Sequence, residues 1–333
     1  MKLRAGVLGG GSWGSTVASL ISSHAHTTLW ARDESTVNEI NTHHTNEKYL
    51  PGGMLRVKLV ASTHLDEVVS QADLVVVGIP SNGFRQIMEK IREHIRPWVP
   101  VVSLTKGLEP KTHFRMTEII QEVLPNHPVG VLSGPNLARE IVAGQAAASV
   151  LAMSQESALS QLRSVFHSGM FRVYTSNDVI GCELGGALKN VIAIAAGMGD
   201  GMGAGDNTKA GVITRGLAEL TRLGIAMGGR PETFAGLAGM GDLLATCSSK
   251  LSRNHTVGVE LGKGRAIKDI ISEMNMVAEG VKSSRVVVDL AKQFKIDMPI
   301  AHAVYGVVHK GKTAKQAFRS ILRTQSGSEA DPG

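Results

Sequence analysis

Cysteine is scarce in this sequence, which has 333 residues and only two cysteines, Cys182 and Cys247. Neither has a second cysteine at the CxxC spacing of redox and zinc motifs. Because two cysteines cannot build a disulfide framework, the sequence predicts a protein of a reducing compartment, the cytoplasm. Histidine is more frequent but scattered, and a pair such as His43–His44 has no third ligand nearby, so we expect no metal site.

Aromatic residues, long apolar runs and blocks of like charge are also lacking. With 4% aromatic residues and a net charge of +6, the chain shows no interleaving of basic and aromatic residues, which argues against a nucleic-acid surface. The small positive excess favours anionic small molecules. The most apolar run, Gly185–Gly199, is too short to span a membrane, and a strand-like segment follows Met1 without a signal peptide. We therefore expect a cytoplasmic protein with no membrane span.

The pattern of apolar residues predicts two domains. In the first half, short apolar runs alternate with helical patterns, which is typical of an α/β fold with a Rossmann-type, doubly wound, mostly parallel sheet. The predicted strands are Leu3–Leu8, Thr27–Trp30, Leu59–Ala61, Asp73–Ile79, Val101–Leu104, Val129–Leu132, Ala147–Leu151 and Phe171–Thr175. The sequence then becomes helical. We predict an NAD(P)-binding domain over residues 1–178, an all-α substrate domain over 179–325 and a disordered tail over 326–333.

A glycine motif lies where the first strand meets the first helix. Gly9, Gly11 and Gly14 form GxGxxG directly after Leu3–Leu8, with Ser12 and Trp13 between the last two glycines. In this setting the first glycine permits a tight turn, the second lets a pyrophosphate approach the backbone, and the third allows close packing of helix on strand. The helix N-terminus favours the anion. We therefore predict a dinucleotide site; a chance cluster of glycines is the alternative.

The residues after the second strand bear on the choice of cofactor. Arg32 comes first and Asp33 second. An acid at this place would bond the ribose 2′-hydroxyl of NAD, whereas an arginine can pair with the 2′-phosphate of NADP. We predict that NADP(H) is accepted, with NAD(H) still open because of Asp33. A solvated turn arginine is the alternative.

Lys189 is the only charged residue of the run Gly185–Gly199. Apolar neighbours would remove water from its ammonium group and lower its pKa towards the range useful for proton transfer. The alternative is a helix-end lysine that reaches solvent.

Further along, Gly197–Asn207 is so rich in glycine that we expect an irregular, mobile loop, or a plain linker.

Two further places could bind a substrate. Lys106 follows a predicted strand, where ligands collect in doubly wound sheets, although an exposed loop lysine would fit as well. The triplet Ser252-Arg253-Asn254 offers a guanidinium, a hydroxyl and an amide to a phosphate. The same triplet is common at the start of a helix, where it would serve as a cap.

Taken together, these segments resemble the bacterial NAD(P)-dependent glycerol-3-phosphate dehydrogenases, up to about Leu322. The matching segments are GGGSWG (Gly9–Gly14), SLTKGLE (Ser103–Glu109), SGPNLARE (Ser133–Glu140), ELGGALKNVIAIAAG (Glu183–Gly197), GDNTKAGVITRGLAE (Gly205–Glu219), AGMGDLLATCSS (Ala238–Ser249), SRN (Ser252–Asn254) and AEG (Ala278–Gly280). Three positions depart from the family pattern: Ala204 where a larger residue is frequent, Gly211 where alanine is usual, and His255 where arginine is common.

The resemblance implies roles for individual residues. Lys189 would transfer the proton. The substrate glycerol 3-phosphate would be bound by Lys106, Gly134, Asn136, Lys189, Asn190, Asp242, Ser252, Arg253 and Asn254. Besides the glycines of the turn, the cofactor would be bound by Ser12, Trp13, Arg32, Lys106, Ala138, Arg253, Val277 and Glu279.

The resemblance further implies reduction of dihydroxyacetone phosphate, a supply of sn-glycerol 3-phosphate to phospholipid synthesis, and a homodimer. Two alternatives use the same residues differently. A related reductase would act on a hydroxy acid and pair Arg253 with a carboxylate. A regulatory protein would sense the nicotinamide cofactor without turnover, and would have no need of Lys189.

Overall fold

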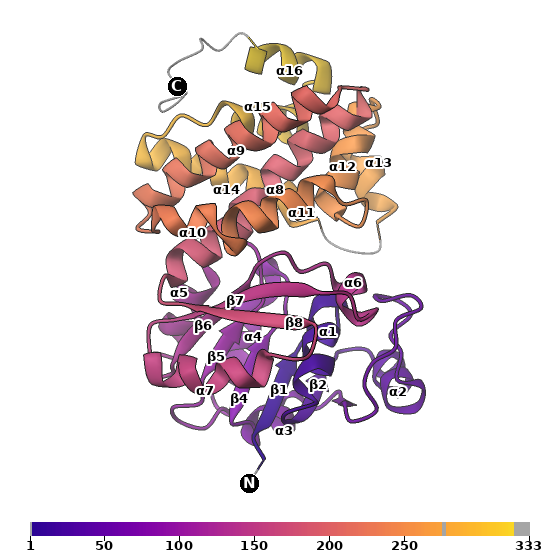
Figure 1. Cartoon of the computed structure of the whole chain (residues 1–333), viewed down its shortest axis with the longest axis vertical. Helices are drawn as coiled ribbons and strands as arrows, with labels where there is room; N and C mark the ends of the chain where they lie inside the picture. Colours follow the sequence, from indigo (N-terminus) through magenta and orange to yellow (C-terminus); the bar gives the residue numbers. More distant parts are fainter. Residues whose placement is uncertain (1, 275–277, 323–333) are drawn as a thin grey trace. The chain divides into compact units, whose positions relative to one another are not determined.

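The computed structural model describes residues 2–274 and 278–322 and divides them into two units (Figure 1). The first unit contains Met1–Lys106 and Phe114–Val179, and the second contains Gly107–His113 and Ile180–Gly333. The short segment Gly107–His113 therefore belongs with the helical unit, although it lies inside the range 1–178 that the sequence assigns to the first domain. The tail predicted to be disordered, residues 326–333, lies outside the described residues.

The first unit is built on one eight-stranded sheet with the order β3-β2-β1-β4-β5-β6-β7-β8. All neighbouring strands are parallel except β6 and β7. The chain moves outward from β1 to β3 and then returns to β4 on the other side of β1, which confirms the predicted doubly wound sheet. The strands are β1 (Arg4–Leu8), β2 (His26–Trp30), β3 (Val60–Ser62), β4 (Leu74–Val77), β5 (Val101–Ser103), β6 (Val129–Ser133), β7 (Ala147–Met153) and β8 (Phe171–Ser176).

Helices cover both faces of this sheet, because its central strands are apolar on both sides. In β4, Leu74 and Val76 pack into one hydrophobic core, whereas Val75 and Val77 pack into a second core on the opposite face. The helices of the unit are α1 (Ser12–Ile21), α2 (Glu34–His43), α3 (Leu65–Ser70), α4 (Ser81–Ile91), α5 (Met116–Val123), α6 (Ala138–Val142) and α7 (Glu156–Phe166).

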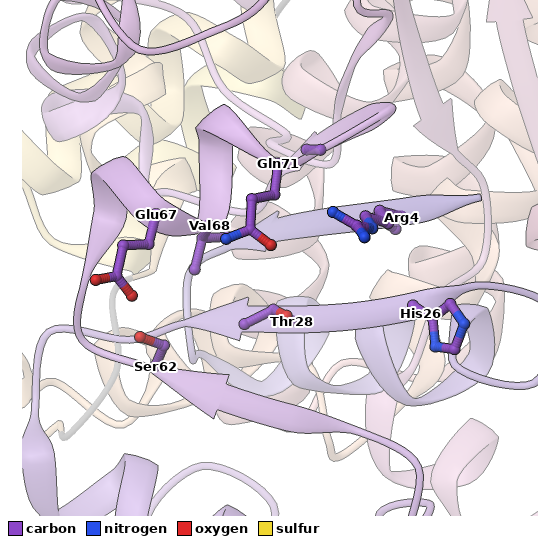
Figure 2. A pocket seen from close by; sticks show the side chains of 9 residues that line it. Arg4, His26, Thr28, Ser62, Glu67, Val68 and Gln71 are labelled. Carbon is purple, nitrogen blue, oxygen red and sulfur yellow. The ribbon is translucent and has the colours of Figure 1, made fainter. Parts of the chain in front are cut away.

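A groove of about 390 Å³ lies on the first unit beside strands β1 and β2 (Figure 2). Its polar lining comes from Arg4, His26, Thr28, Ser62, Glu67 and Gln71. Most of these side chains are exposed, and none is a residue that the sequence predicts for the functional site. The site is therefore to be sought elsewhere, at the turns that follow the strands and within the helical unit.

From Ile180 onward, the described part of the second unit is built of helices joined by short connections, as predicted. Its helices are α8 (Val179–Gly201), α9 (Asp206–Ala226), α10 (Pro231–Ala235), a π-helix η1 (Leu237–Gly241), α11 (Asp242–Ser248), α12 (Arg253–Gly262), α13 (Ile267–Ser272), α14 (Glu279–Phe294), α15 (Pro299–Lys310) and α16 (Ala314–Leu322). The predicted irregular loop Gly197–Asn207 is wrong over most of its length. Helix α8 continues to Gly201, and α9 begins at Asp206.

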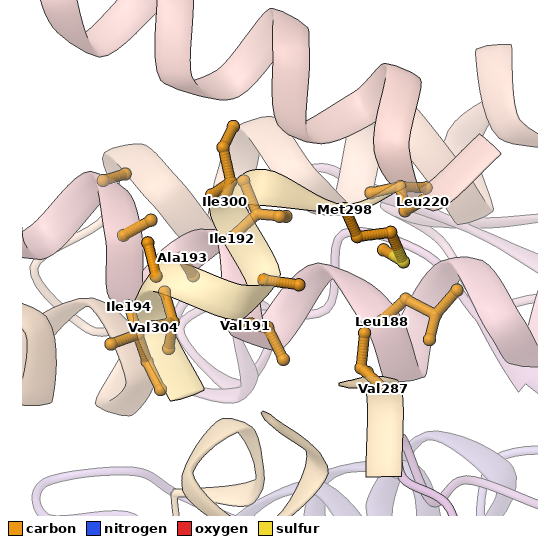
Figure 3. Close-up of a cluster of buried hydrophobic side chains, with 14 of the residues drawn as sticks. Leu188, Val191, Ile192, Ala193, Ile194, Leu220, Val287, Met298, Ile300 and Val304 are labelled. Atoms are coloured by element: carbon orange, nitrogen blue, oxygen red, sulfur yellow. The ribbon is translucent and has the colours of Figure 1, made fainter. Parts of the chain in front are cut away.

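Helix α8 is the core of this unit. Its residues Leu188 to Ala196, Lys189 and Asn190 included, are all buried, and side chains from α9, α14 and α15 surround it (Figure 3). At 23 residues the helix is long and apolar enough to cross a membrane, so the length argument made from the shorter run Gly185–Gly199 is wrong. The most apolar window of α8 is, however, 89% buried inside the protein, as expected for the core helix of a globular unit.

Glu219 is a buried carboxylate that holds two core helices together. It accepts hydrogen bonds from the backbone N–H groups of Ile300 (2.7 Å) and Ala301 (3.1 Å), in the first turn of α15. Burial raises its pKa to about 7, although these two hydrogen bonds act in the opposite direction.

This raised pKa predicts a pH-dependent stability. The folded protein binds a proton at Glu219 that the unfolded chain releases, so this stabilising contribution is lost as pH rises from about 4.5 to about 7. Compared with the Glu219→Gln variant, which cannot titrate, the free energy of unfolding of the unsubstituted protein should fall by about 2–3 kcal/mol between pH 5 and pH 8. Urea denaturation of both proteins at the two pH values measures this, and a constant difference between them would contradict it.

Candidate functional site

The glycine turn of the first unit has the geometry that its sequence predicts. Gly9 has φ +120°, and a Cβ atom there would lie 2.6 Å from the carbonyl oxygen of Gly78. A Cβ on Gly14 would lie 2.0 Å from the carbonyl oxygen of Gly9, so helix α1 packs directly against the turn. At Gly11, by contrast, a Cβ would meet no atom within 4 Å. The space beside Gly11 and the first turn of α1 can therefore admit a pyrophosphate.

Asn46 supports this turn from outside the motif, and it is not among the residues predicted from the sequence. The side chain is fully buried, and its amide nitrogen donates hydrogen bonds to the carbonyl oxygen of Gly10 and to the hydroxyl of Ser15, both at 2.9 Å. The two partners are 36 and 31 residues away in sequence, so no local signal points to the contact. Asn46 therefore helps to fix the shape of the turn.

Arg32 and Asp33 differ in how far their side chains are already engaged in contacts within the protein, and so in how available they are to a cofactor. The Asp33 carboxylate caps helix α2, accepting hydrogen bonds from the Ser35 N–H (3.2 Å) and hydroxyl (3.0 Å), and lies 3.4 Å from the Lys48 amine. The hydrogen bonds from Ser35 and, to a smaller extent, the pairing with Lys48 lower the pKa of Asp33. Arg32 is exposed and has no hydrogen bond or ion pair with any described residue. The arginine is therefore the more available of the two.

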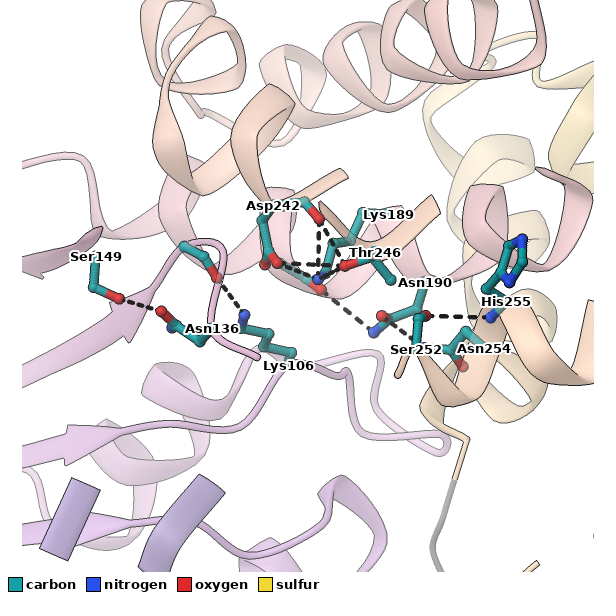
Figure 4. A network of polar contacts seen from close by, with 12 residues as sticks. Lys106, Asn136, Ser149, Lys189, Asn190, Asp242, Thr246, Ser252, Asn254 and His255 are labelled. Carbon is teal, nitrogen blue, oxygen red and sulfur yellow. Dashed lines mark hydrogen bonds and ion pairs between the residues drawn. The ribbon is translucent and has the colours of Figure 1, made fainter. Parts of the chain in front are cut away.

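The ends of β5 and β6 bring further predicted residues together (Figure 4). The Lys106 amine donates to the carbonyl oxygen of Gly134 at 2.6 Å, and the Ser149 hydroxyl donates to Asn136 Oδ1 at 2.6 Å. Gly134 has φ +142°, and a Cβ there would lie 3.1 Å from the Cα of Ser149, so a larger residue would be strained. Lys106 is half-buried, which makes the alternative of an exposed loop lysine wrong. Ala138 begins helix α6 nearby in the chain.

Buried donors without partners indicate what these residues could hold. Asn136 Nδ2 and Trp13 Nε1 are buried and have no hydrogen-bond partner among the residues that the structure describes. The Trp13 ring is held edge-on against Phe171, with ring centroids 6.2 Å apart. Because buried donors in native proteins are almost always satisfied, such atoms are natural contacts for a polar ligand. The glycine turn and these donors together fit a dinucleotide.

In the second unit, Lys189 lies within a polar cluster on helix α8 (Figure 4). Only 4% of this residue is exposed, so the alternative of a lysine that reaches solvent is wrong. Its amine donates hydrogen bonds to the carboxylate of Asp242 and to the hydroxyl of Thr246. The environment is thus not apolar alone, as the sequence suggested, because a buried carboxylate stabilises the ammonium form. Lys189 is therefore a buried amine whose position is fixed by two oxygen partners.

The π-helix η1 sets the position of Asp242. A Cβ on Gly185 of α8 would lie 2.5 Å from the carbonyl oxygen of Ala238, and a Cβ on Gly239 would lie 2.1 Å from the carbonyl oxygen of Phe234. These glycines let η1 lie directly against α8, and Asp242 follows as the first residue of α11. Thr246 stands four residues further on the same helix face. The sequence reading missed Thr246, because its contact with Lys189 spans 57 residues.

The predicted phosphate triplet begins helix α12. The Ser252 hydroxyl caps the helix and accepts from the His255 N–H at 3.3 Å, so the cap reading is correct for this residue. Asn254 is buried and donates to Asn190 Oδ1 at 2.8 Å, while its own oxygen accepts from the Gly280 N–H at 2.9 Å. Its partner Gly280 follows Glu279, the first residue of α14. Val277, which the resemblance assigns to the cofactor, lies outside the described residues.

Arg253 is the member of the triplet that remains exposed at the start of α12. Enough protein surrounds its guanidinium that partial burial lowers its pKa, while the nearby Glu279 carboxylate raises it. An arginine keeps its charge under such a change, and it offers two parallel N–H donors to a phosphate or carboxylate. Arg253 can therefore bind an anionic group.

Helices α8 and α12 meet at four glycines, Gly197 and Gly201 on α8 and Gly258 and Gly262 on α12, which we name the glycine crossing. A Cβ on Gly258 would lie 2.2 Å from the carbonyl oxygen of Ile194, and one on Gly201 would lie 2.1 Å from that of Val259. The two backbones are therefore in direct contact. The crossing fixes the helix that carries Lys189 and Asn190 against the helix that carries Arg253.

Two further features bear on metal binding and on cysteine chemistry at this site. Among the described residues, no group of three or more His, Cys, Asp or Glu side chains could hold a metal ion. Cys247, beside Lys189 and Asp242, is buried, and burial raises its pKa to about 12, so its thiol stays protonated at neutral pH.

Gly211, where the resemblance expects alanine, has open space at its Cβ position. That departure therefore needs no special conformation.

The sequence matches two domain families over nearly its whole length. The NAD-dependent glycerol-3-phosphate dehydrogenase N-terminus matches residues 4–159, and the C-terminus of the same enzyme matches residues 178–319. A glycerol-3-phosphate dehydrogenase (NAD(P)+) of Sphingopyxis alaskensis is 62% identical over 333 residues, covering 100% of both chains. One from Mycobacterium tuberculosis is 51% identical over 324 residues, covering 97% of this chain and 95% of the relative.

Solved structures give the same similarity. The crystal structure of a glycerol-3-phosphate dehydrogenase from Coxiella burnetii superposes with a TM-score of 0.93 at 33% identity, covering 97% of this chain and 99% of that chain. The similarity extends over both units of the chain and is not confined to the dinucleotide fold.

Proposed function

This chain belongs to the NAD-dependent glycerol-3-phosphate dehydrogenase family, and on that premise we propose that it reduces dihydroxyacetone phosphate to sn-glycerol 3-phosphate with NADPH or NADH. The observation that carries the proposal is the buried Lys189 amine, held by Asp242 and Thr246. A buried lysine with an oriented ammonium group is suited to proton transfer. It has no purpose in a protein that only senses the cofactor.

The proton step uses Lys189. When bound, the nicotinamide cofactor would supply the hydride for reduction of the ketone at C2. As the C2 oxygen gains negative charge, the Lys189 ammonium donates a proton to it, and in the reverse direction the neutral amine takes that proton back. Asp242 and Thr246 orient the amine for this transfer through their hydrogen bonds to it.

Two further groups are proposed to act on the same oxygen. Lys106 would add positive charge, and the Asn190 amide would add a hydrogen bond; both interactions strengthen as charge develops in the transition state. The orientation of Asn190 supports this, because Asn254 donates to its oxygen at 2.8 Å and thereby fixes the amide plane. Gly134 and Asn136 would line the pocket beside Lys106.

The substrate phosphate is proposed to bind Arg253. The Ser252 hydroxyl caps α12 and the Asn254 amide is bonded to Asn190 and Gly280, whereas the Arg253 guanidinium brings the positive charge of the triplet and is assigned as the principal phosphate ligand. A charged, planar fork can bond two phosphate oxygens at once. Ser252 and Asn254 would then mainly hold the first turn of α12 in position, with their remaining hydrogen-bonding capacity directed to the phosphate.

The cofactor is proposed to lie along the glycine turn. The pyrophosphate and the adjoining parts of the cofactor would be held by Gly9, Gly11, Ser12, Trp13 and Gly14. The open space at Gly11 supports this placement. The remaining contacts would come from Arg32, Lys106, Ala138, Arg253, Val277 and Glu279. When bound, the cofactor supplies two-electron chemistry that no side chain of this protein can provide.

Arg32 is proposed to recognise the 2′-phosphate of NADP(H), because the competing Asp33 carboxylate already caps α2. Replacing Arg32 by alanine should raise the KM for NADPH by about 10- to 100-fold, the value of a lost charge-assisted hydrogen bond, and change the KM for NADH by less than about threefold. Initial rates with each cofactor measure this, with Arg92→Ala, an exposed arginine at the end of α4, as control. Equal effects on the two cofactors would contradict it.

A single assay tests the proposed reaction. Absorbance of NADPH should fall when dihydroxyacetone phosphate is added, and a ketone that carries a carboxylate instead of the phosphate should be a poor substrate. Preference for the carboxylated ketone would instead support a hydroxy-acid reductase. Binding of NADPH without oxidation by either ketone would support a sensor of the cofactor.

The cellular setting is part of the same proposal. We place the enzyme in the cytoplasm, as a homodimer, where it supplies sn-glycerol 3-phosphate for glycerophospholipid synthesis. The family membership and the scarcity of cysteine support this setting. Gel filtration with light scattering would test the dimer.

A further inference from the structure

Three ionisable side chains from three helices meet at Asp200, outside the groups that the proposed reaction uses. Lys209 Nζ and His255 Nε2 both lie 2.7 Å from the same oxygen, Asp200 Oδ2. Because a carboxylate accepts only, the histidine nitrogen donates. Asp200 lies near the end of α8, Lys209 in the first turn of α9 and His255 in the first turn of α12. Burial raises the pKa of Asp200, but the hydrogen bonds from Lys209 and His255 outweigh it and lower the pKa overall.

His255 connects this cluster to the proposed phosphate site. It is the third residue of α12, directly after Arg253 and Asn254, and its backbone N–H is bonded to the capping hydroxyl of Ser252. The ring is almost fully buried, with 8% of the side chain exposed. Asn254 holds the same turn from its other side through Asn190 and Gly280. The turn that presents Arg253 is thus tied to neighbouring helices by the side chains of the two residues that follow it.

The glycine crossing makes this turn sensitive to small shifts. A Cβ on Gly197 would lie 2.2 Å from the carbonyl oxygen of His255, so the backbone of His255 itself lies against α8. The interface between α8 and α12 is formed by backbone atoms in direct contact. If the contacts of Asp200 were lost, no side chain at this interface could move in to replace them. Loss of the carboxylate charge would leave a buried imidazole and an amine with at most a neutral amide oxygen as their shared acceptor.

We propose that Asp200 is a positioning residue for the substrate phosphate, acting through His255 on the first turn of α12, with Lys209 holding the carboxylate from α9. The inference rests on the proposed function and adds to it, because it assigns a role to His255, where the family commonly has arginine. Either a histidine or an arginine can donate to the Asp200 carboxylate, so the departure preserves the contact.

The test compares kinetics of the full-length protein with phosphorylated and unphosphorylated substrate. Asp200→Asn should raise the KM for dihydroxyacetone phosphate about tenfold, with kcat and the KM for NADPH changed by less than about twofold. Its kcat/KM for dihydroxyacetone, which has no phosphate, should stay the same. His255→Arg should keep the KM for dihydroxyacetone phosphate within about threefold, because a cationic donor remains.

The matched control is Glu260→Gln, which breaks an ion-pair cluster with Lys263 and Arg265 at the other end of the same helix and should leave every constant unchanged. Calorimetric titration with sn-glycerol 3-phosphate gives a readout without turnover, in which Asp200→Asn should bind about tenfold more weakly. An unchanged affinity, or a parallel loss with both substrates and a lowered melting temperature, would overturn the positioning role. Absence of turnover with a tenfold loss of binding would instead reject the proposed reaction and keep this inference.

Discussion

Replacing Lys189 by methionine should lower kcat for the reduction of dihydroxyacetone phosphate by about 10³-fold. The substitution removes the proton donor, which alone contributes about 10²- to 10⁴-fold, and also a positive charge beside the developing alkoxide. Methionine keeps the length and apolar body of the lysine stem, so packing within α8 changes little. Steady-state rates at saturating NADPH measure the loss. Near-normal turnover by a folded Lys189→Met protein would show that Lys189 is not the proton donor.

The partner of Lys189 requires a control for folding. In Lys189→Met the Asp242 carboxylate, 1% exposed, loses its cation, and breaking a buried pair costs about 3–5 kcal/mol of stability. The double variant Lys189→Met/Asp242→Asn removes both charges and should recover much of the melting temperature while staying inactive. Lys263→Met, which breaks an exposed ion pair on α12, serves as the matched lysine control and should keep full activity.

The second large effect is expected at Arg253. Its replacement by alanine should raise the KM for dihydroxyacetone phosphate by about 30- to 5000-fold, since truncating one partner of a desolvated charge pair costs about 2–5 kcal/mol. Turnover at saturation should fall much less, because the arginine is proposed to contact the phosphate and not the reacting carbon. Dihydroxyacetone, which lacks the phosphate, should be used as well by the variant as by the unsubstituted protein.

A comparison with a nearby arginine separates the loss of phosphate binding from a general loss of structure. Arg265→Ala removes an arginine close after α12 that pairs with Glu260 and Glu273, and it should leave the KM unchanged. If Arg253→Ala also left that KM unchanged, the phosphate would bind elsewhere. If the variant instead lost activity towards a carboxylated ketone, Arg253 would belong to the site of a hydroxy-acid reductase.

The fold was predictable from the sequence where local chemistry decides it. Strand β1, the glycine turn and the start of α1 are predicted by residues within a short stretch. Neighbouring atoms leave no room for a side chain at the closely packed glycines of this turn. The end of α8 was not predictable in this way. Gly197 and Gly201 are poor helix formers, and the sequence favours a loop there. They are helical because their missing side chains allow α12 to pack against α8, a tertiary contact that overrides propensity.

The site was predictable in part for the same reason. Lys189 stands out because a single charge in an apolar run needs an explanation, and Arg253 because it lies in a triplet of polar donors. Thr246 and Asn46 carry no such local signal. Their partners are 57, 36 and 31 residues away, and only the folded backbone brings the groups within hydrogen-bonding distance. The segment Gly107–His113 likewise belongs to the helical unit for reasons that chain order does not contain.

The glycine crossing has a consequence for redesign of the enzyme. Because the backbones of α8 and α12 touch, main-chain atoms set the spacing between Lys189, the proposed proton donor, and Arg253, the proposed phosphate ligand. Changing side chains away from the crossing would leave that spacing as it is. A longer phosphorylated ketone would require larger residues at Gly258 or Gly262, which would force the two helices apart and lengthen the gap between the groups that bind the two ends of the substrate.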